Sequence, residues 1–228
     1  MSTVNDLRFI TSAAAAVFVR ECISESRQWQ ALNAIVVFAL VALTSISMGL
    51  RGDRLDSPAV AGGLFWTVQF FTAMSALPRC FVREEDARTA TALRLAAPAA
   101  AVYLGKLAFN AMLAIGLDIL LIPGFMLFIN RPVASVGLLV GSAATGSMAL
   151  VAASTILSAI ASRAGSRTTL FAVMAFPLLL PVLIPAIHAT AIAYGLHGDP
   201  AGDLRFMASY GMMSLVAAMM LFPLVWWA

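Results

Sequence analysis

The stretch VASVGLLVGSAATGSMALVAASTILSAIA, residues 133–161, contains no charged side chain and is closed by Arg163. A helix needs about 20 mostly apolar residues to cross the hydrocarbon core of a bilayer. This stretch is long and apolar enough, so it predicts a transmembrane helix. A barrel strand is not indicated, because the alternation of apolar and polar residues that marks such strands is missing.

Similar apolar runs lie on both sides of this stretch. They predict six transmembrane helices in all, over residues 32–49, 59–77, 103–129, 133–161, 170–193 and 206–227. Residues 6–30 differ, because their apolar centre is too short to span. Five apolar residues there share one helical face, which predicts an amphipathic helix lying in the membrane interface: Leu7, Ile10, Ala14, Val17 and Phe18. The predicted fold is an all-α integral membrane protein with one domain, residues 1–228.

The composition agrees with a membrane protein. Of the 228 residues, 61% are hydrophobic and 11% are charged, whereas soluble domains are about 45–50% apolar and about 25% charged. So few polar groups could not cover the surface of a soluble globule of this size. The composition therefore excludes a soluble enzyme, a nucleic-acid-binding protein and a disordered chain.

The basic residues give the orientation. With the N-terminus in the cytosol, the inner segments hold ten of the fourteen Lys and Arg residues, namely Arg8, Arg20, Arg27, Arg79, Arg83, Arg88, Arg94, Lys106, Arg163 and Arg167. The outer loops hold Arg51, Arg54, Arg131 and Arg205. This split follows the positive-inside rule, so both termini are expected on the cytosolic side.

One inner segment, residues 79–102, is large and polar enough to meet a soluble partner. Acidic side chains precede an apolar stretch there, which predicts a short helix with acids near its start. Such a helix could press into a groove of a partner. The alternative is a solvated loop whose charges only keep it out of the lipid.

Within the spans, three features stand out. Asp118 is an acid deep in a predicted span, where a charge is costly and a function is the default hypothesis; a proton relay, a partner contact and a structural hydrogen-bonded acid are the alternatives. Gly137, Gly141 and Thr145 let helices approach closely, either within the chain or at a dimer seam. Pro177, Pro181 and Pro185 predict a broken or re-entrant fifth span, against the alternative of a kinked continuous helix.

No residue pattern indicates catalysis or a metal site. The two cysteines, Cys22 and Cys80, lie far apart and form no metal-binding spacing. Gly105-Lys106 lacks the upstream glycine and the following Ser or Thr of a phosphate-binding loop. We therefore expect no catalytic residue and no bound metal.

Two motifs resemble the haem exporter permeases of cytochrome c maturation, the CcmB-type family of type-two ABC exporter subunits. The segment FVREEDARTATALRLAAP with AVYLGKLAFN is similar to the family signature, and FPLLLPVLIP (residues 176–185) is similar to its proline-rich fifth span. The resemblance covers essentially the whole chain. The residues that match the signature are Phe81, Arg83, Glu84, Glu85, Leu93, Leu95, Pro98, Gly105 and Lys106.

The resemblance implies a permease that borrows a separate ABC ATPase, with haem as cargo of the complex and no cofactor bound directly. It also implies a haem-handling membrane subunit, a small helper subunit, a haem chaperone, two permease copies and the bacterial inner membrane. Segment 79–102 would be the coupling segment. The residues expected to contact the ATPase are Phe81, Arg83, Glu84, Glu85, Asp86, Arg88, Leu93 and Leu95.

Other functions are also compatible with the sequence. A type-two ABC permease for another lipophilic cargo, such as a lipid, drug or glycan, would have the same spans. A membrane enzyme or a proton-coupled carrier that uses Asp118 would act without an ATPase. His188 and His197 lie near the outer side and are candidate haem ligands. Trp226 and Trp227 are expected to be an aromatic anchor at the inner interface.

Overall fold

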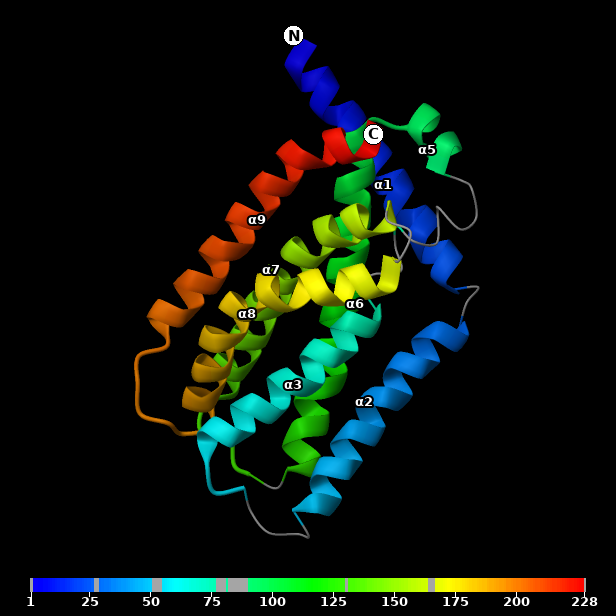
Figure 1. Ribbon diagram of the computed structural model, residues 1–228. Coiled ribbons are helices and arrows are strands. Elements are labelled where there is room, and N and C mark those ends of the chain that lie inside the picture. Colours follow the sequence, from blue (N-terminus) through cyan, green and yellow to red (C-terminus); the bar gives the residue numbers. More distant parts are fainter. Residues whose placement is uncertain are drawn as a thin grey trace.

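The computed structural model describes residues 2–26, 29–50, 55–76, 81, 90–129, 131–163 and 167–227. Throughout this part of the chain every regular element is a helix, which confirms the all-α prediction. Figure 1 shows the helices side by side, most of them running along one common direction. Their bounds are α1 Ser2–Ser26, α2 Trp29–Gly49, α3 Pro58–Ala76, α5 Ala90–Ala96, α6 Ala99–Phe128, α7 Val136–Ser162, α8 Arg167–Ala193 and α9 Ala201–Trp227.

Local sequence explains several helix ends. Pro98 precedes α6 in an extended conformation and is followed by three alanines, the strongest helix formers. Ser135 caps α7, since its hydroxyl accepts a hydrogen bond from the Leu138 amide at 3.3 Å. After α8, Gly195 adopts a φ of +99°, which a residue without Cβ reaches most readily. The Leu196 amide then donates back to the Ala191 carbonyl at 3.0 Å and ends the helix.

Four helices of the described residues are long and apolar enough to cross a membrane. They are Ala99–Phe128, Val136–Ser162, Val173–Ala193 and Ala201–Trp227, and Asn33–Gly49 is a shorter apolar helix. Helices α2 and α3 fall where the first two spans are predicted. The chain is thus a helical membrane protein, and the count of six spans stays a prediction.

Helix α7 lies at the centre of the bundle and packs against α6, α8 and α9. Helix α3 packs on α8, whereas α2 packs less extensively against α3 and α6. In Figure 1 the C-terminal end of α9 and α5 lie at the same end of the bundle, with α1 beside them. We call this the inner end, because it carries the segments predicted to face the cytosol, and the opposite end the outer end.

Helix α8 differs from the predicted broken span. It is one helix from Arg167 to Ala193 and contains Pro177, Pro181 and Pro185. Its contacts with α3 and α7 on either side support the helical path, and transmembrane helices tolerate proline where neighbours satisfy the backbone. The Tyr210 hydroxyl of α9 donates to the Leu178 carbonyl at 2.6 Å and so ties α8 to α9. The alternative of a continuous helix agrees with this structure.

Helix α1 begins and ends about four residues earlier than the amphipathic helix predicted over residues 6–30. It packs along α6 over much of its length. Its position in the membrane interface stays a prediction.

Candidate functional site

The inner end holds a buried ion pair between α1 and α6. Lys106 Nζ lies 2.9 Å from Glu21 Oε1, and the two side chains are 0% and 1% exposed. The same ammonium lies 4.9 Å from the centroid of the Phe81 ring. A buried charge is costly unless it is paired, and removing one partner leaves the other uncompensated. The pair therefore holds α1 in one position on α6.

Gly105 allows the close approach that this ion pair needs. A Cβ at this position would lie 2.7 Å from the Ala14 carbonyl oxygen and 2.7 Å from Val17 Cβ. The α1 backbone thus packs directly on the α6 backbone one residue before Lys106. Glu21 was not singled out from the sequence, where it interrupts the apolar face of the first helix. The sequence does carry a signal for Glu21, because it is an acid on an otherwise apolar helical face. The chain contains a single lysine with which such an acid could pair.

The Phe81 ring packs against two aromatic rings of α9. The Phe81 ring centroid lies 5.5 Å from that of Phe222 and 6.4 Å from that of Trp226. Tyr103 of α6 completes the group, with its ring centroid 5.2 Å from Phe222. We call Phe81, Tyr103, Phe222 and Trp226 the inner aromatic cluster. It attaches Phe81, at the start of the predicted coupling segment, to α9 and through Phe222 to α6.

Three of the eight residues predicted to contact an ATPase are described. Phe81 and Leu93 are buried in the inner end, whereas Leu95 of α5 is 84% exposed. Leu95 is therefore the side chain among these three that is free to meet another protein, and the two buried ones connect the segment to the bundle. The other five predicted contacts lie outside the described residues: Arg83, Glu84, Glu85, Asp86 and Arg88.

A polar cluster in the middle of the bundle joins three helices. Gln69 of α3 donates through Nε2 to Asp118 Oδ1 of α6 at 2.8 Å and to Ser147 Oγ of α7 at 2.9 Å. The Ser147 hydroxyl donates to the same Asp118 oxygen at 3.0 Å. All three side chains are buried. Asp118 is thus a hydrogen-bonded acid, as the structural alternative expects.

Two partners of Asp118 were not identified from the sequence. Gln69 is the one amide or charged side chain in residues 59–77, which is a usable signal. Ser147 has no such signal, because serine occurs throughout the fourth span. Gln69 Oε1 is buried and has no hydrogen-bond donor among the described residues. The cluster can lock three helices together, or exchange a proton if its carboxyl becomes accessible.

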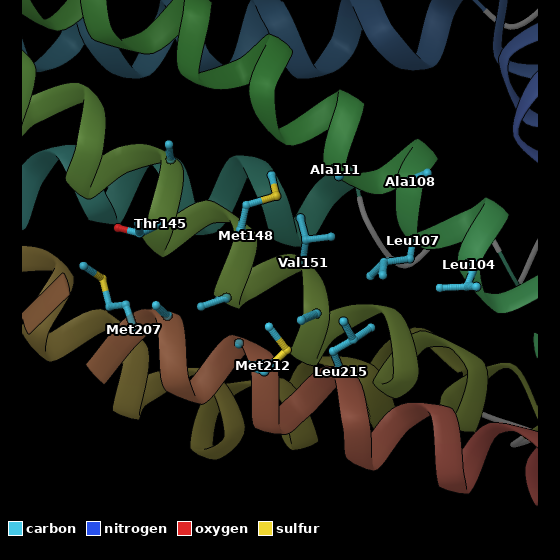
Figure 2. Close-up of a pocket in the computed structure, with 15 residues that line it drawn as sticks. Leu104, Leu107, Ala108, Ala111, Thr145, Met148, Val151, Met207, Met212 and Leu215 are labelled. Atoms are coloured by element: carbon cyan, nitrogen blue, oxygen red, sulfur yellow. The ribbon is translucent and has the colours of Figure 1, made fainter. Parts of the chain in front are cut away.

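An apolar groove of about 580 Å³ lies between α6, α7 and α9. Figure 2 shows side chains of these helices facing this space, with Thr145 as the polar residue among those labelled. Methionine thioethers from α7 and α9 contribute flexible, polarisable surface. The groove therefore suits apolar chains or rings. The labelled lining residues are Leu104, Leu107, Ala108, Ala111, Thr145, Met148, Val151, Met207, Met212 and Leu215.

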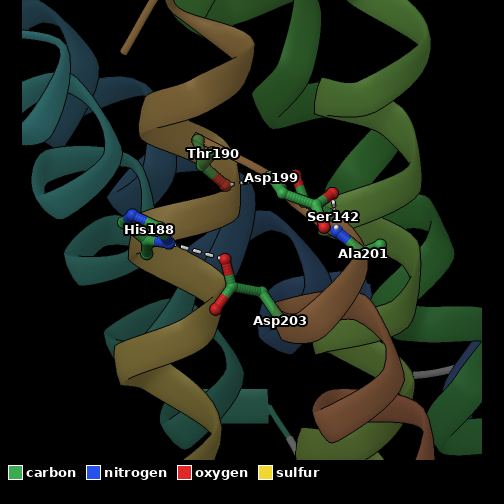
Figure 3. Close-up of polar contacts among 6 residues, drawn as sticks. All are labelled: Ser142, His188, Thr190, Asp199, Ala201 and Asp203. Atoms are coloured by element: carbon green, nitrogen blue, oxygen red, sulfur yellow. Dashed lines mark hydrogen bonds and ion pairs between the residues drawn. The ribbon is translucent and has the colours of Figure 1, made fainter. Parts of the chain in front are cut away.

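The described part of the outer end contains neutral hydrogen bonds between side chains and an exposed ion pair. Trp66 Nε1 donates to Thr190 Oγ1 at 2.8 Å, and that oxygen lies 3.2 Å from Ser142 Oγ. Figure 3 shows the latter contact together with His188, whose Nδ1 lies 2.6 Å from Asp203 Oδ2. His188 therefore joins the end of α8 to the start of α9. The other histidine considered as a haem ligand, His197, is exposed in the connecting loop.

The loops of the outer end are tied by backbone groups. The Arg131 guanidinium donates to the carbonyls of Leu55 and Tyr194. The amides of residues 134 and 135 both donate to the Ala193 carbonyl, at 2.9 and 3.1 Å. Burial raises the pKa of Tyr194 to about 12, although the nearby Arg131 charge opposes this shift. These contacts fix the outer loops against one another.

The predicted packing glycines behave differently from their neighbour Gly146. A Cβ at Gly137 or Gly141 would meet nothing within 4 Å, whereas one at Gly146 would collide with the Trp66 ring. Thr145 turns its hydroxyl back to the Gly141 carbonyl at 2.7 Å. On α7 it is therefore Gly146, and not Gly137 or Gly141, that lets a neighbouring side chain pack closely. The dimer seam at Gly137 and Gly141 stays a prediction.

Within the described ranges no group of three or more His, Cys, Asp or Glu side chains could hold a metal ion. Cys22 of α1 is a free thiol, and burial together with the Glu21 charge raises its pKa.

Comparison with known families gives one match. The family model described as CcmB protein matches residues 12–224, which is nearly the whole chain. No curated protein and no solved structure matches this chain.

Proposed function

The chain belongs to the CcmB family of haem-exporting ABC permease components for cytochrome c maturation, and on that premise we propose how it couples to ATP hydrolysis. A separate ABC ATPase subunit docks on the coupling segment, residues 79–102. Hydrolysis there drives haem export or the release of a haem-loaded chaperone. The observation that carries this proposal is the inner aromatic cluster, which joins Phe81 of the coupling segment to α6 and α9.

The described side chains favour a mechanical role for this subunit. Buried polar side chains such as Asp118 and Thr190 are hydrogen-bonded between helices, and the groove between α6, α7 and α9 is apolar. Such an interior suits helix movement or a lipophilic cargo better than a path for a polar solute. The proposed assembly contains two copies of this chain, the ATPase, a haem-handling membrane subunit and a small helper. It lies in a bacterial inner membrane with both termini in the cytosol.

The test is purification of the tagged chain from its native membrane in mild detergent, followed by mass spectrometry of the associated proteins. We expect an ABC ATPase together with a haem-handling subunit, in a ratio that gives the copy number. An ATPase without a haem-handling subunit would favour a permease for another lipophilic cargo. A folded chain with no ATPase would contradict the proposal.

A charge reversal tests the docking segment itself. We expect Glu84→Lys combined with Glu85→Lys to weaken ATPase binding and cytochrome c maturation, because the two substitutions reverse the charge of the surface proposed to meet the ATPase. Normal binding and normal maturation in this variant would remove these two residues from the interface.

A further inference from the structure

Two adjacent tryptophans end α9 in opposite environments. Trp226 is 5% exposed, whereas Trp227 is 62% exposed. A pair of interfacial anchors would both face the membrane surface. The burial of Trp226 therefore needs another explanation, and its neighbours supply one.

Trp226 is contacted from both ends of one stretch of the coupling segment. The Phe81 ring meets it edge-on, at a centroid distance of 6.4 Å and an interplanar angle of 71°. The Arg94 guanidinium carbon of α5 lies 5.3 Å from the centroid of the Trp226 ring. A cation near the face of an indole and an edge-to-face ring pair are both attractive arrangements. One side chain thus holds the two ends of residues 81–94 together.

The same side chain is fixed to the long helices. Trp226 stacks on Phe222 at 5.4 Å and 24°, and Phe222 contacts Tyr103 of α6. From the end of α7, the Arg163 guanidinium donates to the carbonyls of Val225 and Trp226 at 3.2 Å. The last turn of α9 is therefore held by α6 and α7 while it holds the coupling segment.

From these contacts we propose that Trp226 is a positioning residue that transmits movement of the coupling segment to α6, α7 and α9. The inference rests on the proposed coupling to an ATPase. Because Phe81 and Arg94 both contact this ring, a displacement of either residue is passed to the end of α9. The ring carries this role, since Trp226 Nε1 has no acceptor among the described residues.

The experiment uses the complete complex in lipid nanodiscs, with the Trp226→Ala and Trp226→Phe variants. Trp227→Ala is the matched control on the next residue. Two quantities are measured: ATP hydrolysed, and haem-loaded chaperone released per ATP. Co-purification of the ATPase is checked for each variant. A residue that only stabilises the fold would change yield, but it would leave the amount released per ATP unchanged.

We expect Trp226→Ala to lower release per ATP by about tenfold, because it removes the ring that both ends of the segment share. Trp226→Phe should stay within about twofold of the wild type, since a phenyl ring keeps the stacking. Trp227→Ala should behave as the wild type. An unchanged ratio in Trp226→Ala, or an equal loss in Trp227→Ala, would overturn the inference.

A second variant tests the same inference if the Trp226→Ala protein does not fold and cannot be purified. Arg94→Gln removes the cation and leaves the tryptophan in place, and we expect it to lower release per ATP severalfold. No change in that ratio would overturn the inference as well. The wild-type complex separates this outcome from a failure of the proposed function, because ATP-independent release by the wild type would refute the coupling itself.

Discussion

The two ends of the helical bundle are held together by different chemistry. At the inner end, side chains from α1, α6, α9 and the coupling segment meet through the Lys106–Glu21 ion pair and the inner aromatic cluster. At the outer end, neutral hydrogen bonds such as Trp66–Thr190 and loop contacts to backbone carbonyls predominate. The outer contacts join neighbouring loops and helix ends, whereas the inner contacts join long helices to Phe81 and α5 of the segment predicted to bind an ATPase. We therefore expect ATPase binding to affect the inner end and to leave the outer end unchanged.

The largest effect is expected from breaking the buried ion pair. Lys106→Met removes the ammonium that lies 2.9 Å from the buried Glu21 carboxylate, so we expect a loss of about 3–5 kcal/mol in the free energy of unfolding. The exposed Arg20, 3.8 Å from Glu21, is too solvated to compensate. Denaturation of the purified protein in detergent measures this loss.

The double variant Lys106→Met with Glu21→Gln is the control for that experiment. Because neither residue then carries a charge, most of the lost stability should return. If Lys106→Met alone lowers the free energy of unfolding by less than about 1 kcal/mol, the ion pair is no stronger than a surface salt bridge. The inner end would then lack the feature that distinguishes it.

A smaller loss is expected from widening the contact between α1 and α6. Gly105→Ala places a Cβ against Ala14 and Val17, so it should cost about 1–3 kcal/mol through overpacking. Gly116→Ala on the same helix is the matched control, because a Cβ there meets nothing within 4 Å. Thermal unfolding of both variants gives the comparison, and equal midpoints would contradict the close packing of α1.

The buried acid in the middle of the bundle should matter less. Asp118→Leu removes the shared acceptor, but Gln69 and Ser147 can still bond to each other at 2.9 Å. We therefore expect a loss of about 1 kcal/mol, as for other hydrogen bonds between membrane helices. Asp118→Asn keeps an acceptor oxygen and should lose less. If Asp118→Asn abolishes haem export in a folded complex, Asp118 is a proton relay and more than a structural link.

The smallest effect is expected at the exposed ion pair of the outer end. His188→Ala removes the contact with Asp203, and an exposed pair of this kind contributes about 0–1 kcal/mol. His197→Ala is the control in the same loop region. Haem binding by the purified chain is measured in parallel by absorbance, and loss of a bound haem in His188→Ala alone would make this histidine a ligand.

The sequence predicts the long helices well, because each span is an apolar run closed by charged or loop residues. The six predicted spans fall on α2, α3, α6, α7, α8 and α9. The proline rule failed for α8, where neighbouring helices allow a continuous helix through three prolines. Local sequence could not reveal this, because the supporting contacts come from other elements.

The candidate site shows the same limit. Asp118 stands out in the sequence as an acid among apolar residues, but its partners come from two other helices. Trp226 and Trp227 are identical neighbours in the sequence. Only the contacts of Trp226 with Phe81 and Arg94 distinguish them. The sequence therefore identifies residues whose burial in the membrane costs free energy. The fold determines which side chains they contact.

Hydrogen exchange followed by mass spectrometry tests the difference between the two ends most directly. Backbone exchange is measured for the permease complex with and without its ATPase subunit, over peptides from residues 90–106 and 215–227 at the inner end and 186–200 at the outer end. We predict that ATPase binding slows exchange in the two inner peptides and leaves the outer peptide unchanged. Equal changes at both ends, or no change at the inner end, would contradict the account.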